Sequence, residues 1–366
     1  MKIHTIFFLS EFVLGGAGNS VYKLCKNLSK KNYQISIICV NKCYYKKLFR
    51  KEGINVYEIN AKRALFAFFK IKKLLRKLIS KNYKSNIFLS NINYSNILTI
   101  LFLRSLKLKI CLIERTPFQE LDIYYSKMDF IKKNMIKLLI KITFHKADAC
   151  ISNSKFISKI YNKKFNLKFK TIFPPSFDGI SIYKRKYFKN SKIKFVTVCR
   201  LSKEKGISKL IEIFSKYKKE FSLDIIGDGP ELYNLKKLAY NIHENKNIRF
   251  LGVINPLKIK FCLKKYDYFI NFSDFEGFPN SVVESLSVGV PVLASQSYGG
   301  INEILSNKNF GLIFNNRRLL EKYLKDIYNK KLMIKINRSQ VMNHLNNFSV
   351  KKNIENYDKL LKNLSK

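Results

Sequence analysis

Apolar and polar positions follow a repeating strand-then-helix pattern along most of the chain. Short apolar runs predict buried strands, and stretches with apolar residues three and four positions apart predict amphipathic helices. In the first half we predict strands at residues 3–9, 34–40, 55–59, 87–90 and 109–114, and helices at 20–29, 64–79 and 129–146. This alternation is typical of a parallel sheet covered by helices on both faces.

The pattern breaks near residues 171–187, where Pro174-Pro175 is followed by small, polar and then basic residues. It then restarts, with strands predicted at 194–199, 222–226, 248–251, 268–272 and 290–294 and helices at 206–218, 231–241, 256–264, 279–286 and 319–328. We therefore expect an α/β chain of two Rossmann-like, doubly wound domains at residues 1–178 and 193–345, joined by a linker at 179–192. A central cleft between facing domains is the expected ligand site.

The charge of the chain is strongly positive. Lys and Arg number 70 against 25 Asp and Glu, which gives a net charge of +45. Nucleic acid, an anionic membrane surface and phosphorylated substrates are the partner classes that such a charge suits. A genome biased toward Lys, Asn and Ile codons produces the same excess without a functional cause.

Cysteines and apolar runs indicate the compartment. The seven cysteines are scattered without a CxxC pair, which argues against a disulfide framework or zinc module and suits a reducing cytosol. Glu11 interrupts the first apolar run, which favours a first strand over an export signal. No run approaches the ~20 apolar residues that span a bilayer. We expect a cytoplasmic protein.

The densest group of chemically useful residues is DFEGFPNSVVE at 274–284, directly after a predicted strand. Pro279 suits the first turn of a helix, and Gly277 lets a ligand approach the backbone. The unpaired N–H groups of that helix start favour an anion or a sugar hydroxyl. Glu276 and Glu284 supply two carboxylates that can accept hydrogen bonds from hydroxyls. An ordinary capping region with a solvent-facing Glu is the plainer interpretation.

A second segment, CRLSKEKG at 199–206, lies between a predicted strand and the next helix. Arg200 begins the loop outside the carboxyl end of the strand, and Lys205 precedes the helix. The planar donor fork of Arg and the compact charge of Lys together suit the two phosphates of a diphosphate.

Glycine-rich turns follow three other predicted strands, at Gly15-Gly16, at Gly227-Asp228-Gly229-Pro230 and at Gly299-Gly300. None is a P-loop or a full GxGxxG fingerprint. The four histidines have no metal-ligand spacing, and no DxD or GxSxG occurs. We expect no metal site.

Taken in order, these motifs resemble the family-4 retaining glycosyltransferases, which have the GT-B fold. The matching residues are the E-x7-E pair Glu276/Glu284, the RLxxxKG segment 200–206, Gly227-x-Gly229-Pro230, the GGxxE run 299–303 and the Gly15-Gly16 turn. The resemblance runs from the first strand to about residue 315 and is more specific in the second half.

The resemblance implies roles for these residues. Arg200 and Lys205 would hold the diphosphate of a nucleotide sugar, Glu276 the donor-sugar hydroxyls, and Glu284 the ribose. The Gly15-Gly16 turn would approach the phosphates, and Val253 would flank the base. The other donor-binding residues that the resemblance implies are Gly229, Gly277, Phe278, Pro279 and Asn280.

The resemblance also implies sugar transfer with retention, in which the leaving diphosphate takes the acceptor proton. The donor is expected to be UDP-linked by family habit, with no cofactor and no required metal. At ERTP (114–117), Arg115 stands where many family members carry a His. A permanently charged Arg cannot deprotonate an acceptor, but it could bind an acceptor phosphate or the donor sugar. We count Arg115 with Glu276 as candidate catalytic residues.

Two basic helices, at 66–79 and 130–146, combine apolar stripes with lysine faces, as interfacial helices do. A core-facing helix with a solvated basic side has the same pattern. The interfacial interpretation predicts a lipid-linked glycan acceptor, as in surface polysaccharide synthesis, and a peripheral location on the inner face of the cytoplasmic membrane. The terminal segment 346–366 is expected to form a helix that packs back on the first domain.

Two other functions compete with sugar transfer. A GT-B relative that hydrolyses or epimerises a nucleotide sugar would need no acceptor. A nucleic-acid-binding protein would use the positive charge, but the lysines are spread along the whole chain and no binding module is recognisable. We therefore expect no nucleic-acid partner.

Overall fold

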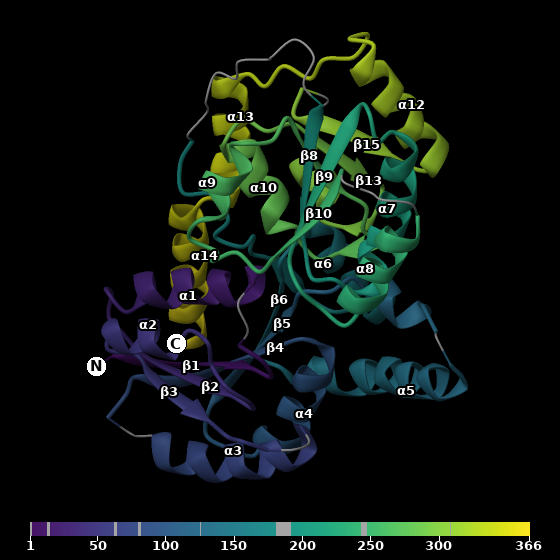
Figure 1. The fold of residues 1–366 in the computed structure, drawn as a ribbon. Coiled ribbons are helices and arrows are strands. Elements are labelled where there is room, and N and C mark those ends of the chain that lie inside the picture. Colours follow the sequence, from purple (N-terminus) through teal and green to yellow (C-terminus); the bar gives the residue numbers. More distant parts are fainter. Residues whose placement is uncertain are drawn as a thin grey trace. The chain divides into compact units, whose positions relative to one another are not determined.

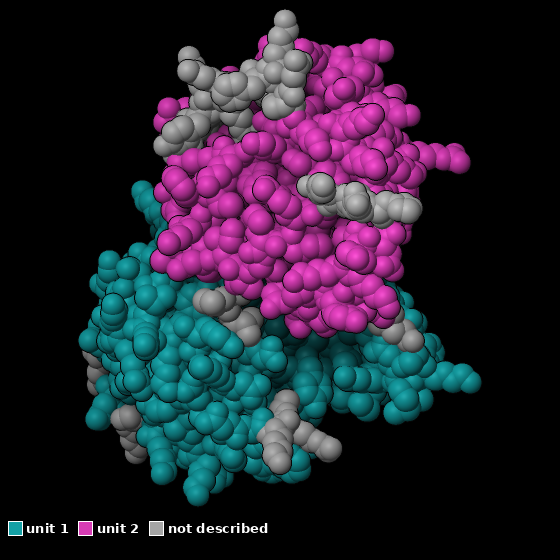
Figure 2. Space-filling view, viewed as in Figure 1, with its two compact units in different colours: residues 1–175, 348–366 teal, residues 176–347 magenta. Residues whose placement is uncertain are grey.

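The structure is a computed structural model, which describes residues 2–12, 15–61, 64–79, 82–124, 126–180, 192–242, 247–307 and 309–366. The chain divides into two compact units (Figure 2). Unit 1 comprises residues 1–175 and 348–366, and unit 2 comprises residues 176–347. Most of the predicted linker, residues 181–191, lies outside the described residues.

Unit 1 is built on a sheet of seven parallel strands in the order β3-β2-β1-β4-β5-β6-β7 (Figure 1). The strands are β1 (Ile3–Leu9), β2 (Tyr33–Cys39), β3 (Asn55–Glu58), β4 (Ser85–Asn91), β5 (Lys109–Glu114), β6 (Ala149–Ser152) and β7 (Phe169–Thr171). The strand order reverses between β1 and β4, as in doubly wound Rossmann folds.

Helices cover both faces of this sheet, because successive side chains of a strand point to opposite faces. Phe7 of β1 packs in one core with Leu361, and the next residue, Phe8, packs in the other core with Phe68 and Ile140. The helices are α1 (Gly16–Leu28), α2 (Lys46–Lys51), α3 (Ala64–Leu78), α4 (Asn93–Leu103), α5 (Lys127–Thr143), α6 (Lys155–Phe165) and α14 (Val350–Leu364), with 3-10 turns at Phe118–Asp122, Phe144–Lys146 and Asn346–Phe348.

The last helix, α14, belongs to unit 1 although unit 2 precedes it in sequence. It packs against α1 and buries Tyr357 and Leu361 in the core. The Tyr33 hydroxyl donates to Asp358 Oδ1 at 2.8 Å, and Asn353 Nδ2 donates to the backbone carbonyl of Phe173 at 2.6 Å. These contacts attach the end of the chain to both β2 and the segment that leaves unit 1.

Unit 2 repeats the doubly wound pattern with six parallel strands in the order β10-β9-β8-β11-β13-β15. The strands are β8 (Ile193–Val198), β9 (Phe221–Ile226), β10 (Ile248–Gly252), β11 (Tyr268–Asn271), β13 (Val292–Ser295) and β15 (Gly311–Phe314), and β12 (Phe275–Glu276) pairs separately with β14 (Tyr298–Gly299). The helices are α7 (Ile207–Lys216), α8 (Leu232–Asn241), α9 (Ile259–Leu263), α10 (Asn280–Ser287), α11 (Ile301–Ile304), α12 (Arg317–Tyr328) and α13 (Arg338–Leu345), with a 3-10 turn at Lys203–Lys205. Here the order reverses between β8 and β11.

The sequence pattern misses several elements and misplaces others. It misses the helices α2, α4, α6, α11 and α13 and the strands β6, β7, β12, β14 and β15. Helix α4 has apolar residues on most of its surface and is largely buried, so it lacks the one-sided periodicity that reveals an amphipathic helix. The predicted start of the first helix at residue 20 is wrong, because α1 begins at Gly16 and the Asn19 N–H donates to the Gly15 carbonyl at 2.9 Å.

Candidate active site

The two charged segments singled out in the sequence meet at the carboxyl ends of β8 and β11, where the strand order of unit 2 reverses. Ligands of doubly wound sheets bind at such a switch point, because the loops diverge there and leave a crevice. Arg200 follows β8, and Asp274 follows β11. The Asp274 backbone N–H donates to the Glu204 carbonyl at 2.8 Å, which joins the two loops.

Lys205 and Glu276 form an ion pair within this pair of loops. Lys205 Nζ lies 2.7 Å from Glu276 Oε1, and both side chains are about 15% exposed, at 14% and 15%. The Ser273 hydroxyl donates to the same carboxylate oxygen at 2.9 Å. Burial by itself lowers the pKa of Lys205, but the Glu276 carboxylate more than offsets this and the pKa is raised overall. Lys205 therefore carries its positive charge at neutral pH.

A small parallel sheet fixes the backbone of Glu276. Strand β12 pairs with β14, which aligns Phe275 with Tyr298 and Glu276 with Gly299. The Gly300 N–H donates to the carbonyls of Glu276 and Gly277, at 3.3 and 3.1 Å. The Gly299-Gly300 turn thus positions the Glu276 loop, a role that the sequence pattern does not reveal because the two segments are separate in the chain.

The remaining predicted donor-site residues of unit 2 lie around this pair. Pro279 precedes α10, Asn280 begins it, and the half-buried Glu284 lies within it. Asn280 Oδ1 accepts a hydrogen bond from the Ser176 hydroxyl at 2.6 Å. Phe278 is buried, whereas Arg200 after β8 and Val253 after β10 are exposed. Arg200 makes no side-chain hydrogen bond or ion pair with any described residue, so its guanidinium is available to an anion.

Gly227 and Gly229 are required by packing against the β8 loop. A Cβ atom on Gly227 would lie 1.8 Å from the Cys199 carbonyl oxygen, and one on Gly229 would lie 2.4 Å from that of Leu201. The Leu201 N–H donates to the Asp228 carbonyl at 2.9 Å. The glycines therefore allow two loops to run in close contact beneath Arg200. A direct contact of Gly229 with the donor stays a prediction.

In unit 1, the predicted glycine turn lies at the carboxyl end of β1, beside the point where the strand order reverses. A Cβ added to Gly15 would meet nothing within 4 Å, so packing does not require a glycine there. Gly16 begins α1. Ile92, after β4, has φ of +77°, a conformation that costs a β-branched residue about 1–3 kcal/mol. No sequence signal predicts this strain at the switch point.

Arg115 lies just beyond β5 and is half-buried among α1, α14 and the segment before unit 2. Its Nε donates to Asn91 Oδ1 at 2.7 Å, and it forms no ion pair with a carboxylate among the described residues. The hollow that it lines with Ser20 and Tyr357 measures about 10 Å³, room for roughly one water molecule. Burial lowers the pKa of Arg115. The predicted role of this side chain toward an acceptor stays a prediction.

The neighbouring residue, Glu114, is fully buried. Asn96 Nδ2 donates to its Oε1 at 2.6 Å. Burial raises the pKa of Glu114 well above its ordinary value of 4.5, so the carboxyl group resists ionisation in the folded chain.

Glu114→Gln is therefore expected to stabilise the chain at neutral pH. A raised folded-state pKa means that the stability contribution of Glu114 is complete below pH 4.5 and falls as pH rises toward the folded pKa. The loss is about 1.4 kcal/mol per pH unit within that window, and the Gln variant escapes it. Urea midpoints of both proteins between pH 4.5 and 8 measure the difference. The exposed Glu355→Gln change is the control, and a pH-independent gap between Glu114→Gln and the parent would contradict the assignment.

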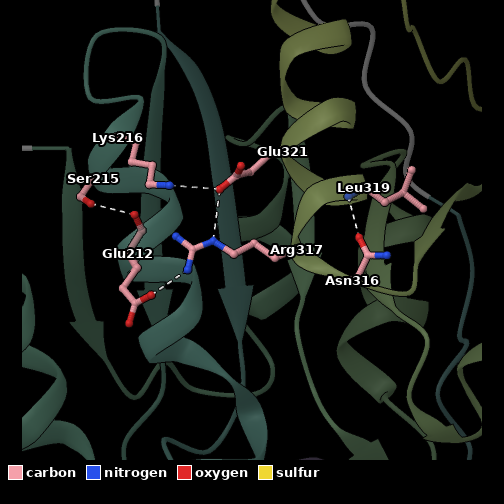
Figure 3. Close-up of polar contacts among 7 residues, drawn as sticks. All are labelled: Glu212, Ser215, Lys216, Asn316, Arg317, Leu319 and Glu321. Atoms are coloured by element: carbon pink, nitrogen blue, oxygen red, sulfur yellow. Dashed lines mark hydrogen bonds and ion pairs between the residues drawn. The ribbon is translucent and has the colours of Figure 1, made fainter.

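A hollow of about 540 Å³ adjoins the candidate site at the carboxyl ends of β11, β13 and β15, and its lining includes Ser273, Asp274, Lys209 and Arg317. None of the predicted donor-binding residues lines it. Arg317 donates to Glu212 at 2.9 Å and to Glu321 at 3.2 Å, which ties α12 to α7 (Figure 3). Because two carboxylates already face this guanidinium, the hollow is a poor anion site.

The described part of the chain offers little for nucleophilic or metal-dependent chemistry. Burial raises the pKa of Cys199 to about 12, so this thiol beside the candidate site stays protonated and is a weak nucleophile. Across the described ranges, no group of three or more His, Cys, Asp or Glu side chains is arranged to hold a metal ion. One of the four histidines, His243, lies outside the described residues.

Comparison with known proteins assigns the family. Residues 180–343 match "Glycosyl transferases group 1", and residues 14–174 match "Glycosyltransferase Family 4". Alpha-monoglucosyldiacylglycerol synthase of Streptococcus pneumoniae is 25% identical over 325 residues, which are 82% of this chain and 72% of that protein. An N-acetylgalactosaminyltransferase of Campylobacter jejuni that acts on a diphospho-undecaprenol glycan is 29% identical over 68% of this chain and 66% of its own length.

Solved structures share the fold at low sequence identity. Anabaena HepE in complex with UDP and glucose superposes with a TM-score of 0.76 at 16% identity, covering 98% of this chain and 99% of that one. Sucrose-phosphate synthase of Thermosynechococcus elongatus superposes with a TM-score of 0.80 at 13% identity, covering 100% and 99%. The chain has two Rossmann-like units, and each part of it matches a glycosyltransferase family model. It therefore belongs to the group 1, family 4 glycosyltransferases of the GT-B fold.

Proposed function

We propose that this protein transfers a hexosyl or N-acetylhexosaminyl group from a UDP-sugar to a lipid-linked glycan acceptor during synthesis of a bacterial surface glycan. The observation that carries the proposal is the partly exposed Lys205–Glu276 ion pair at the switch point of unit 2, beside the exposed guanidinium of Arg200. The names of the Streptococcus and Campylobacter relatives contain a diacylglycerol and a diphospho-undecaprenol, which supports a lipid acceptor.

The charges of the pair suit a diphosphate and a sugar. Lys205 is positive and held in place by Glu276, and Arg200 adds a second positive charge with a planar set of donors. We propose that both cations face the donor phosphates and that Glu276 accepts hydrogen bonds from the donor-sugar hydroxyls. The fixed ion pair means that neither group must reorganise when the phosphates gain charge as the sugar departs.

The proposed reaction proceeds with retention at the anomeric carbon. The bond from that carbon to the donor phosphate oxygen breaks, the acceptor oxygen bonds on the same face, and the departing diphosphate takes the acceptor proton. No protein side chain is then required as a base, and no metal is proposed as a requirement. Arg115 is proposed to hold an acceptor phosphate.

Donor binding is tested by thermal shift against UDP-, GDP- and ADP-sugars in moderately high salt, which suppresses non-specific attraction of anions to the lysines. We expect UDP-sugars alone to raise the melting temperature of the parent protein, by roughly 5 °C at a hundredfold excess over Kd. Glu284→Ala is expected to lose this shift while melting near the parent temperature without ligand, because Glu284 is proposed to hold the ribose. Each titration is repeated with EDTA.

Other results would point elsewhere. An equal shift with all three bases, or a full shift in Glu284→Ala, would mean that the chain shares the fold of the family but not the proposed donor binding. Donor turnover at the same rate with and without a lipid acceptor would favour a hydrolase or an epimerase. Loss of the shift in EDTA would contradict metal independence.

A further inference from the structure

Helix α5 has an apolar stripe that faces solvent. Each of its five side chains is at least half exposed, from 75% for Met128 to 51% for Ile142. Their spacing of three and four residues puts them on one face of the helix. The stripe consists of Met128, Ile131, Met135, Leu138 and Ile142. A different face of α5, with Ile136, Ile140 and Thr143, packs into the core, so the stripe is additional to the face that the fold requires.

Lysines border the stripe. At 100° per residue, Lys132 lies along one side of it and Lys127 and Lys141 along the other, and all three are exposed. Asp129, the acid within α5, pairs with Lys133 at 3.1 Å on the side toward the core. The stripe is therefore an apolar band with exposed lysines on both sides.

Exposed apolar residues also lie on the two helices next to α5 in this layer, α4 and α3. Helices α3, α4 and α5 lie in a row on one face of the sheet of unit 1, with α5 at the end of the row (Figure 1). Leu65, Phe66 and Phe69 of α3 are exposed, and so is Leu101 of α4. The Phe69 ring contacts Phe102 of α4 edge-on, with ring centroids 4.9 Å apart. An apolar surface spread over adjacent helices marks an interaction site more strongly than single exposed residues do.

We propose that the α5 stripe, supported by the exposed residues of α3, docks unit 1 on an anionic lipid bilayer. The stripe enters the boundary between headgroups and acyl chains, and its bordering lysines meet the lipid phosphates. No helix in the described ranges is long and apolar enough to cross a membrane, so α5 lies along the surface. This inference extends the proposed function, because a lipid-linked acceptor lies in a bilayer. It concerns docking alone, and its test needs neither donor nor acceptor.

Charge favours a bilayer over a second copy of the chain. If two copies paired through their stripes, the lysines of each α5 would face those of the other, and the one acid of each helix is already paired. An anionic bilayer supplies both the negative charge that the lysines lack and an apolar layer for the stripe.

The test is co-sedimentation of the full chain with vesicles of phosphatidylcholine and phosphatidylglycerol in about equal parts, at fixed salt. Met135→Ser/Leu138→Ser is expected to weaken binding roughly tenfold or more, because two exposed apolar side chains leave the interface. The matched control is Leu257→Gln/Phe261→Gln, which removes an exposed apolar pair from unit 2 and is expected to bind like the parent. Replacing Lys127, Lys132 and Lys141 by Gln is expected to remove most of the preference for anionic over purely zwitterionic vesicles.

Parent-like binding by the stripe variant, or equal weakening in the unit 2 control, would overturn the proposal. So would a stripe variant that turns a dimer into a monomer in sedimentation velocity while its vesicle binding is unchanged, since that outcome assigns the stripe to a second copy. Circular dichroism and the melting temperature of each variant without ligand check that the fold is intact, and neither measurement requires that the chain bind a UDP-sugar. A failure of docking is thereby distinguished from a failure of the proposed function.

Discussion

Lys205→Met is expected to lower kcat/KM for sugar transfer by a factor on the order of 10²–10³, because it removes a fixed positive charge from the place where the leaving diphosphate gains negative charge. The variant is also expected to lose about 2–3 kcal/mol of stability, since Glu276 is left largely buried without its cation. The activity is measured as UDP release with lipid acceptors present, at a temperature where the variant is folded.

A double variant separates the two effects. Lys205→Met/Glu276→Gln removes both charges, so most of the lost stability is expected to return while activity stays low. Lys209→Met is the matched control, because Lys209 lies one turn further on and pairs with Asp274 at 3.3 Å in an exposed position. Near-parent activity in Lys205→Met, or a recovery of activity in the double variant, would refute the proposed electrostatic role.

Gly227→Ala is expected to destabilise unit 2 by about 3 kcal/mol or more, the largest effect on folding that we expect from a single methyl group in this chain. Gly227 has φ of +139°, and the added Cβ would lie 1.8 Å from the Cys199 carbonyl oxygen. The loop after β9 must then move away from the loop that carries Arg200. Because the chain has no tryptophan, unfolding in urea is followed by far-UV circular dichroism.

Gly252→Ala is the control for backbone conformation in the same unit. Gly252 also has a positive φ, +69°, but a Cβ there would meet nothing within 4 Å. It is expected to cost only about 1 kcal/mol, the price of a left-handed conformation for Ala. If the two variants unfolded at the same urea concentration, close packing against Cys199 would not be the reason for glycine at residue 227.

Much of the fold is predictable from local pattern. Strands such as residues 3–9 and 109–114 coincide with β1 and β5, because an apolar run between polar stretches suits a buried parallel strand. Helix α4 is missed for a related reason. It is buried on several sides and so has no polar face, which is the feature that identifies an amphipathic helix in a sequence. Its position can be understood only from the elements that pack around it in the folded chain.

For the candidate site, the sequence supplies the residues but not their partners. The motifs that contain Lys205 and Glu276 are both recognisable, yet their separation of 71 positions gives no sign that the two charges pair. The support of the Glu276 loop by Gly299-Gly300 is likewise invisible, since a parallel pairing joins segments that the chain itself keeps apart. Arg115 is the opposite case, in which a residue that is conspicuous in the sequence proves to be half-buried and to line a hollow of only about 10 Å³.

The two doubly wound domains and the family are predictable from the sequence, because hydrophobic periodicity and short motifs are properties of contiguous residues. Which charges meet and which apolar faces remain exposed depends on the folded chain, because both involve residues that are far apart in the sequence. The pattern of residues 130–146 is compatible with a core-facing or an interfacial helix. In the structure, α5 buries Ile136 and Ile140 on one side and exposes Met135 and Leu138 on another, and whether the exposed side meets a bilayer stays a prediction. Periodicity counts apolar positions, whereas burial depends on what the rest of the chain packs against them.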